Sequence, residues 1–148
     1  MIMSLINPLN IFTSKVKFIE QFATNDETRN QAMQFWKHLD SACPILLTVA
    51  LIIGCVGAWY YYKPFNNQPG RHYKLCYWFY FLIGACVVSL MASYGLELLL
   101  APTRLRGVTQ TYLTMALAYA VVTFMAFLIV SVCFCKIPSL KTNAYKLI

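Results

Sequence analysis

PILLTVALIIGCVGAWYYY, residues 44–62, is one of three stretches that decide the fold of this chain. The other two are LCYWFYFLIGACVVSLMASYGLELLL, residues 75–100, and YLTMALAYAVVTFMAFLIVSVCFC, residues 112–135. Glu97 is the only ionised side chain within them. The shortest stretch, about 19 residues, would reach roughly 28 Å as a helix, close to the thickness of the hydrocarbon core of a bilayer. The sequence therefore predicts three membrane-spanning helices.

Composition agrees with lipid as the surrounding medium. Apolar residues make up 59% of the chain and charged residues 11%, whereas soluble domains have about 45–50% and about 25%. We expect an all-α integral membrane protein with an N-terminal helical region (1–43), a three-span membrane domain (44–135) and a basic tail (136–148). Asn7 and Pro8 interrupt the first apolar run, and no basic segment precedes it. We therefore expect the first span to act as the targeting signal.

The N-terminal region predicts two amphipathic helices. Thr24 and Glu27 match a capping box at the start of the second, and Pro44 suits the first turn of the following span. We expect the apolar faces to lie on the membrane surface or on a partner, or else to cover the protein's own spans. The residues at helical spacing on these faces are Phe12, Val16, Ile19, Phe22, Met33, Trp36 and Leu39.

The net charge of +7 is distributed in a way that favours lipid over nucleic acid. Basic residues flank the spans, where they set orientation and contact anionic head groups, so we expect no nucleic-acid partner. In the first loop, Arg71, His72 and Lys74 follow a Pro-Gly turn and are candidates for binding the phosphate of a lipid or a nucleotide. The basic residues nearest the spans favour an N-terminus outside and a C-terminus inside.

Small residues recur every four positions along the spans. In lipid no hydrophobic effect drives helices together, so close approach at small residues becomes a main source of attraction. The pattern predicts helix packing, either within the chain or against another subunit. The predicted packing residues are Ala50, Gly54 and Ala58 in the first span, Ala85, Ser89 and Ser93 in the second, and Ala116 and Ala120 in the third.

Glu97 lies about one turn before the end of the second span. A charge at that depth either pairs or has a function, because desolvation makes it costly. We expect Glu97 to pair with Arg104 or Arg106, with a role in ion passage or subunit coupling as the alternative.

Catalytic and metal-binding motifs are lacking in the sequence. Cys133 and Cys135 are two residues apart, so on a helix they point in different directions. His38 and His72 have no partner at ligand spacing. No Ser-His-acid set or glycine-rich phosphate loop is apparent. We expect neither an enzyme nor a cofactor.

These observations favour a non-catalytic structural or accessory subunit of a larger integral membrane complex, such as a secretion, transport or energy-transducing assembly. Its expected partners are the bilayer and other membrane subunits or copies of itself, in a bacterial inner membrane or an organellar membrane. The alternative is a self-oligomerising pore or permeabilising effector with a holin-like layout. A third interpretation is a lipid or small-ligand sensor that binds through the first loop.

Overall fold

The computed structural model describes residue 8 and residues 14–65, 75–103, 105 and 107–135. Within this part of the chain every regular element is helical. The elements are α3 (Lys15–Phe22), α4 (Asp26–Tyr60), the π-helical turn η1 (Tyr61–Phe65), α5 (Leu75–Leu100) and α6 (Thr109–Cys135). As predicted, three helices are long and apolar enough to cross a membrane: α4 with η1, α5 and α6.

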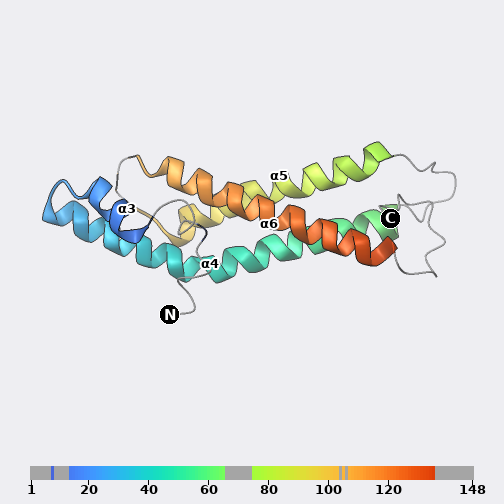
Figure 1. The fold of residues 1–148 in the computed structure, drawn as a ribbon, viewed down its shortest axis with the longest axis horizontal. Coiled ribbons are helices and arrows are strands. Elements are labelled where there is room, and N and C mark those ends of the chain that lie inside the picture. Colours follow the sequence, from blue (N-terminus) through green and yellow to red (C-terminus); the bar gives the residue numbers. More distant parts are fainter. Residues whose placement is uncertain (1–7, 9–13, 66–74, 104, 106, 136–148) are drawn as a thin grey trace.

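The three long helices form an elongated bundle in which each pair is in contact (Figure 1). Successive long helices run in opposite directions, so α4 and α6 run the same way. The first turns of α4 project beyond the ends of α5 and α6, and α3 folds back against them. The connection between α5 and α6 therefore lies at the same end of the bundle as α3.

The first span differs from its prediction. Residues 26–60 form one helix of 35 residues, so the second predicted amphipathic helix and the first span are a single element, and α3 alone is separate. Pro44 lies inside α4, not in a first turn. The buried residues of α4 keep one helical phase across the proline, from Leu39 through Leu46 to Ala50. We attribute the continuity of α4 to this unbroken packed face, because tertiary packing outweighs the local preference to end a helix at proline.

Side-chain hydroxyls supply extra hydrogen bonds around Pro44. The Ser41 hydroxyl donates to the carbonyl of His38, and the Thr48 hydroxyl donates to the carbonyl of Pro44, both at 2.8 Å. Each hydroxyl therefore has an acceptor within its own helix.

The cap of α4 lies one residue later than predicted. Asn25, not Thr24, is the N-cap, and Thr28 takes the place expected for Glu27. The Thr28 hydroxyl accepts from the backbone N–H of Asn25 at 3.0 Å and donates to the Asn25 carbonyl at 2.8 Å. A hydroxyl can make both bonds, whereas a carboxylate only accepts, which explains why threonine fits here.

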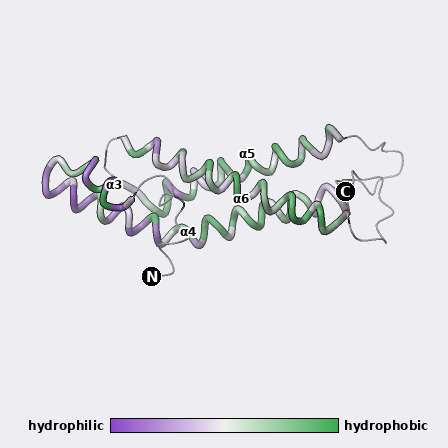
Figure 2. Tube along the Cα trace, viewed as in Figure 1, coloured by the Kyte–Doolittle hydropathy of each residue, from purple (hydrophilic) through white to green (hydrophobic). Residues whose placement is uncertain are grey.

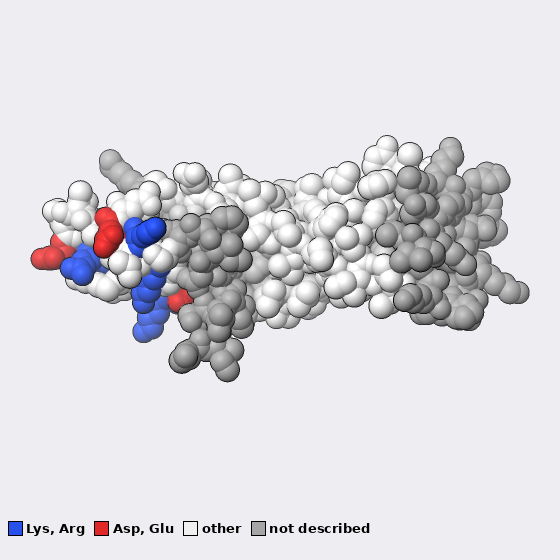
Figure 3. Space-filling model, viewed as in Figure 1, with Lys and Arg blue, Asp and Glu red and all other residues white. Residues whose placement is uncertain are grey.

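Polar and apolar residues separate along the bundle. Figure 2 shows hydrophilic positions gathered in α3 and the first part of α4, with hydrophobic positions along the rest of the bundle. The charged side chains visible in Figure 3 lie at the same end, and the uncharged surface extends along the middle. Large apolar side chains such as Ile52, Val88 and Ile129 are exposed on the three long helices. Such a surface suggests a multi-pass membrane protein, because water would not favour so much exposed apolar area.

Candidate functional site

A line of polar side chains follows the inner face of α5. Ser89, Ser93 and Glu97 are four residues apart, so they share one face of the helix, and each has 0% of its surface exposed. The sequence predicts the two serines as small packing residues and Glu97 as a separate intramembrane charge. The structure places all three together inside the bundle.

Thr123 of α6 joins one end of this line to the other helices. Its hydroxyl lies 2.6 Å from the Ser89 hydroxyl oxygen, 3.0 Å from the Ala50 carbonyl oxygen and 3.1 Å from the carbonyl oxygen of Tyr119. Because a hydroxyl carries one proton, Thr123 donates to one of these oxygens at a time, and it can accept the proton of the Ser89 hydroxyl while it donates to a carbonyl. One side chain therefore connects α4, α5 and α6 through polar contacts.

The other end of the line has polar groups without hydrogen-bond partners. Within the described part of the chain, both carboxyl oxygens of Glu97, the Ser93 hydroxyl and the Tyr119 hydroxyl are buried and make no hydrogen bond. The Cys43 thiol approaches the Tyr119 hydroxyl without reaching hydrogen-bonding geometry. The Glu97 carboxyl is close enough to interact electrostatically with Tyr112 and Tyr119. Buried polar groups without partners are unfavourable, so this cluster needs an explanation.

Aromatic side chains close the bundle beyond Glu97. The Tyr112 hydroxyl donates to the carbonyl of Ala101 at 2.6 Å and thereby ties α6 to the end of α5. Phe35 of α4 packs edge-on against Tyr112 with ring centroids 5.5 Å apart. Phe18 of α3 packs on Phe35, with ring centroids 5.8 Å apart. The Glu97 site is therefore separated from the polar end of the molecule by a layer of rings.

Two sequence predictions concern residues that the structure does not describe. Arg104 and Arg106, the predicted partners of Glu97, lie outside the described residues. The candidate phosphate-binding residues Arg71, His72 and Lys74 also lie outside them. Both predictions therefore stay predictions.

The small-residue stripes face the inside of the bundle. Ala120 is partly buried, and the other seven predicted packing residues are buried. A Cβ placed on Gly54 would lie 2.7 Å from the carbonyl oxygen of Thr123 and 2.8 Å from the Cβ of Ala126. The backbones of α4 and α6 thus approach so closely that only glycine fits at position 54. These stripes pack the three long helices against one another.

A separate apolar groove of about 580 Å³ opens between α4 and α5. A Cβ placed on Gly84, on the α5 side, would meet no atom within 4 Å. The groove was not predicted from the sequence, because Gly57 and Gly84 lie outside the four-residue stripes and only the antiparallel register of α4 and α5 brings them together. The lining residues are Ile52, Ile53, Val56, Gly57, Tyr60, Tyr80, Phe81, Gly84, Ala85 and Val88.

The predicted apolar face of the N-terminal region divides into buried and exposed parts. Trp36 and Leu39 are buried, and Ile19 and Phe22 are partly buried against the same core. Val16 and Met33 are 63% and 39% exposed, and Phe12 lies outside the described residues. The main contact of α3 is instead Phe18, which the predicted face omitted. Much of this region therefore covers the protein's own helices.

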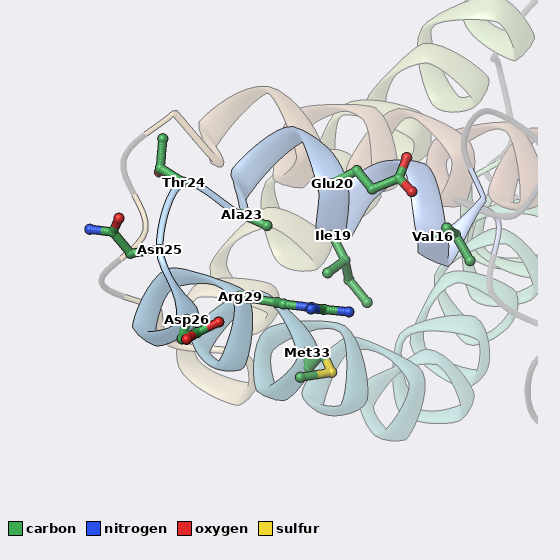
Figure 4. Close-up of a pocket in the computed structure, with 9 residues that line it drawn as sticks. All are labelled: Val16, Ile19, Glu20, Ala23, Thr24, Asn25, Asp26, Arg29 and Met33. Carbon is green, nitrogen blue, oxygen red and sulfur yellow. The ribbon is translucent and has the colours of Figure 1, made fainter.

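An open cavity of about 820 Å³ lies between α3 and the start of α4. Figure 4 shows the Arg29 side chain extending across it below Ile19, with Met33 beneath and Asp26 to one side. Its described lining combines apolar side chains with the charged groups of Glu20, Asp26 and Arg29.

No group of three or more His, Cys, Asp or Glu residues that could hold a metal ion occurs in the described part of the chain. Comparison of the chain with protein-family models, with curated proteins and with solved structures finds no match.

Proposed function

We propose that this chain is a multi-pass membrane protein that serves as a non-catalytic subunit of a larger integral membrane complex. The observation that carries the proposal is the groove between α4 and α5. It is apolar, contains small residues and faces outward from the bundle, where a second membrane protein can reach it. Its proposed occupant is a transmembrane helix of another subunit.

The groove suits a helix for three physical reasons. Association in lipid depends on close packing, which glycine allows, and Gly84 leaves room for a partner backbone. The α4 wall from Ile52 to Tyr60 rises roughly 12 Å, about two helical turns. Tyr60 and Tyr80 at one end offer hydroxyls to a neighbouring backbone or head group.

The burial of the small-residue stripe of α4 supports the groove as the docking surface. Ala50, Gly54 and Ala58 are already in contact with the chain's own helices, so they are not free for a second subunit. The groove is a small-residue surface of α4 and α5 that the chain's own helices leave open. A subunit that attaches to a complex in lipid needs such a surface.

Photo-crosslinking in native membranes tests the proposal. A photoreactive amino acid replaces Val56 or Val88 in the groove. The same replacement at Val121 or Ile129, on the exposed face of α6, is the matched control. We expect one discrete protein adduct from the groove positions and none from α6. An adduct at the mass of a dimer would identify a second copy of this chain as the occupant. Lipid adducts alone, or equal labelling from both faces, would contradict the proposal.

The pore alternative receives no support from the exposed surface. Ser89, Ser93 and Thr123, which a pore would use as polar lining, are buried inside a single bundle. The hydroxyls of Thr48 and Thr114 donate to carbonyls of their own helices. The described residues therefore offer no continuous polar stripe around which copies could assemble.

The bundle also constrains the proposed topology. Because successive long helices are antiparallel, α3 and the end of α5 belong to one side of the membrane, and the ends of η1 and α6 belong to the other. We propose that the α3 side is outside, following the distribution of basic residues. The proposed membrane is a bacterial inner membrane or an organellar membrane.

A further inference from the structure

The buried polar atoms without hydrogen bonds, among the described residues, belong to three side chains in one region. Ser93 and Glu97 are one turn apart on α5, and Tyr119 interacts electrostatically with Glu97 from α6. Ser93 and Glu97 have 0% of their surface exposed and Tyr119 has 1%. Together they bring four oxygen atoms into the interior of the bundle, two of which belong to the Glu97 carboxyl group and share its single negative charge when it is ionised.

The groups around Glu97 supply no positive charge within the described part of the chain. From α4, Cys43 interacts with Glu97, and Asp40 interacts with Cys43. From α6, Tyr112 and Tyr119 interact with Glu97. On α5 itself, Tyr94 packs on Tyr112 with ring centroids 6.3 Å apart. From α3, the apolar side chains of Phe18, Ile19 and Phe22 pack on the hydrophobic core that also contains Tyr112 and Tyr119.

We propose that Glu97, Ser93 and Tyr119 form an internal binding site for a small monovalent cation, either a proton or Na⁺. A single carboxylate is balanced by a single positive charge, whereas a divalent ion would leave excess charge among apolar side chains. Carboxylate and hydroxyl oxygens suit a hard cation such as Na⁺. The same oxygens suit a shared proton, because a protonated carboxyl donates one hydrogen bond and each hydroxyl both donates and accepts.

The position of the site fits a cation that enters from the polar end of the bundle. Glu97 lies three residues before the end of α5, and the ring layer of Phe18, Phe35 and Tyr112 separates it from that end. Towards the middle of the bundle the polar line ends at Ser89 and Thr123, which bond to each other. A cation held at Glu97 is therefore occluded, with its nearest exit past the rings.

Thermal unfolding of the full-length protein in detergent micelles tests the proposal. A ligand that binds only the folded state raises the unfolding temperature as its concentration rises. In the first arm, NaCl replaces choline chloride at constant ionic strength and pH. In the second arm, pH is raised in the absence of Na⁺. If Na⁺ is the ligand, we expect the unfolding temperature of the wild type to rise by a few degrees per tenfold increase in Na⁺ concentration. If the proton is the ligand, we expect the unfolding temperature to fall by a few degrees per unit increase in pH.

Glu97→Gln decides whether the response belongs to this site. The amide keeps the shape of the carboxyl but carries no charge, so the variant should lose the response seen in the wild type. Glu20→Gln makes the same chemical change at an exposed position of α3 and should respond as the wild type does. Equal responses of the wild type and Glu97→Gln, or a wild type insensitive to both Na⁺ and pH, would overturn the proposal.

Two milder variants keep the test decisive if Glu97→Gln does not fold. Ser93→Ala and Tyr119→Phe each remove one hydroxyl and retain most of the packing volume. If Na⁺ is the ligand, both variants should need a severalfold higher Na⁺ concentration for the same increase in unfolding temperature. For a proton, both should shift the pH at which the unfolding temperature changes. Unaltered responses in both variants would show that these hydroxyls do not belong to a cation site.

Discussion

At Gly54 the backbone of α4 meets α6, and a Cβ there would lie 2.7 Å from the Thr123 carbonyl oxygen. We predict that Gly54→Ala destabilises the bundle by about 1–3 kcal/mol, the usual effect of overpacking a close interface. Gly84→Ala is the matched control, because the added methyl group meets nothing within 4 Å. Unfolding in detergent measures both variants. Equal stability of the two would contradict the close approach of α4 and α6.

Thr123 makes the polar contacts that connect the three long helices. We predict that Thr123→Val lowers the free energy of unfolding by about 0.6–1.7 kcal/mol, the range measured for hydrogen bonds between helices in membranes. Thr48→Val is the control, since the Thr48 side chain is exposed and its hydroxyl bonds within its own helix. Unfolding of each variant in the same detergent gives the comparison. A larger effect of the control would show that the contact between helices contributes little.

At the scale of residues, the sequence was informative about spacing but not about partners. The four-residue spacing of Ser89, Ser93 and Glu97 is visible in the sequence and places them on one face. Nothing in the sequence alone shows that Tyr119, from another helix, meets that face, because the contact depends on the register between α5 and α6. The role of Gly84 in the groove was not predicted either, because it depends on the register between α4 and α5.

At the scale of elements, α3 depends on one aromatic anchor. Phe18 packs against Trp36 and Phe35, with ring centroids 5.3 Å and 5.8 Å apart. Replacing a buried Phe by Ala costs about 3–5 kcal/mol, enough to release a helix of 8 residues. We predict that Phe18→Ala speeds hydrogen exchange throughout α3 and leaves the middle of α5 protected.

Val16→Ala provides the control for this prediction. Val16 is on the same helix but largely exposed, so its truncation should leave the exchange of α3 unchanged. If Phe18→Ala and Val16→Ala behaved alike, the contact between α3 and α4 would not be what holds α3 in place.

The extents of the long helices were predictable to different degrees. The long, predominantly apolar sequence of α5 predicts its bounds, and α6 begins three residues before its predicted start. The predicted start of the first span, residue 44, was wrong. Pro44 and the change from polar to apolar composition both indicate a boundary there, but α4 continues through it. The phase of Ala32, Leu39 and Leu46 across the proline was the available signal for one continuous helix.

At the scale of the whole molecule, the proposed subunit role makes the α4–α5 groove a separate target for mutation. We predict that Gly84→Leu fills the groove and removes the protein from its complex in a native gel, while the monomer keeps its unfolding temperature because nothing lies within 4 Å of the new Cβ. Val121→Phe enlarges an exposed side chain on α6 and should leave the complex intact. A complex that survives Gly84→Leu would rule out the groove as its docking site.

The whole-molecule arrangement of three apolar helices follows from composition, since segments of this length and hydropathy have few other stable environments. Its function does not follow in the same way. Gly57, Gly84 and their neighbours indicate where a helix can approach, but small apolar residues carry little information about the identity of that helix.

Extraction of native membranes with alkaline carbonate tests the central claim most directly, because this treatment strips peripheral proteins and leaves lipid-embedded ones in place. Because the exposed apolar side chains of α4, α5 and α6 would lie against acyl chains in the proposed membrane, we predict that the protein stays in the membrane pellet and enters solution only with detergent. Its release into the carbonate supernatant without detergent would contradict the account.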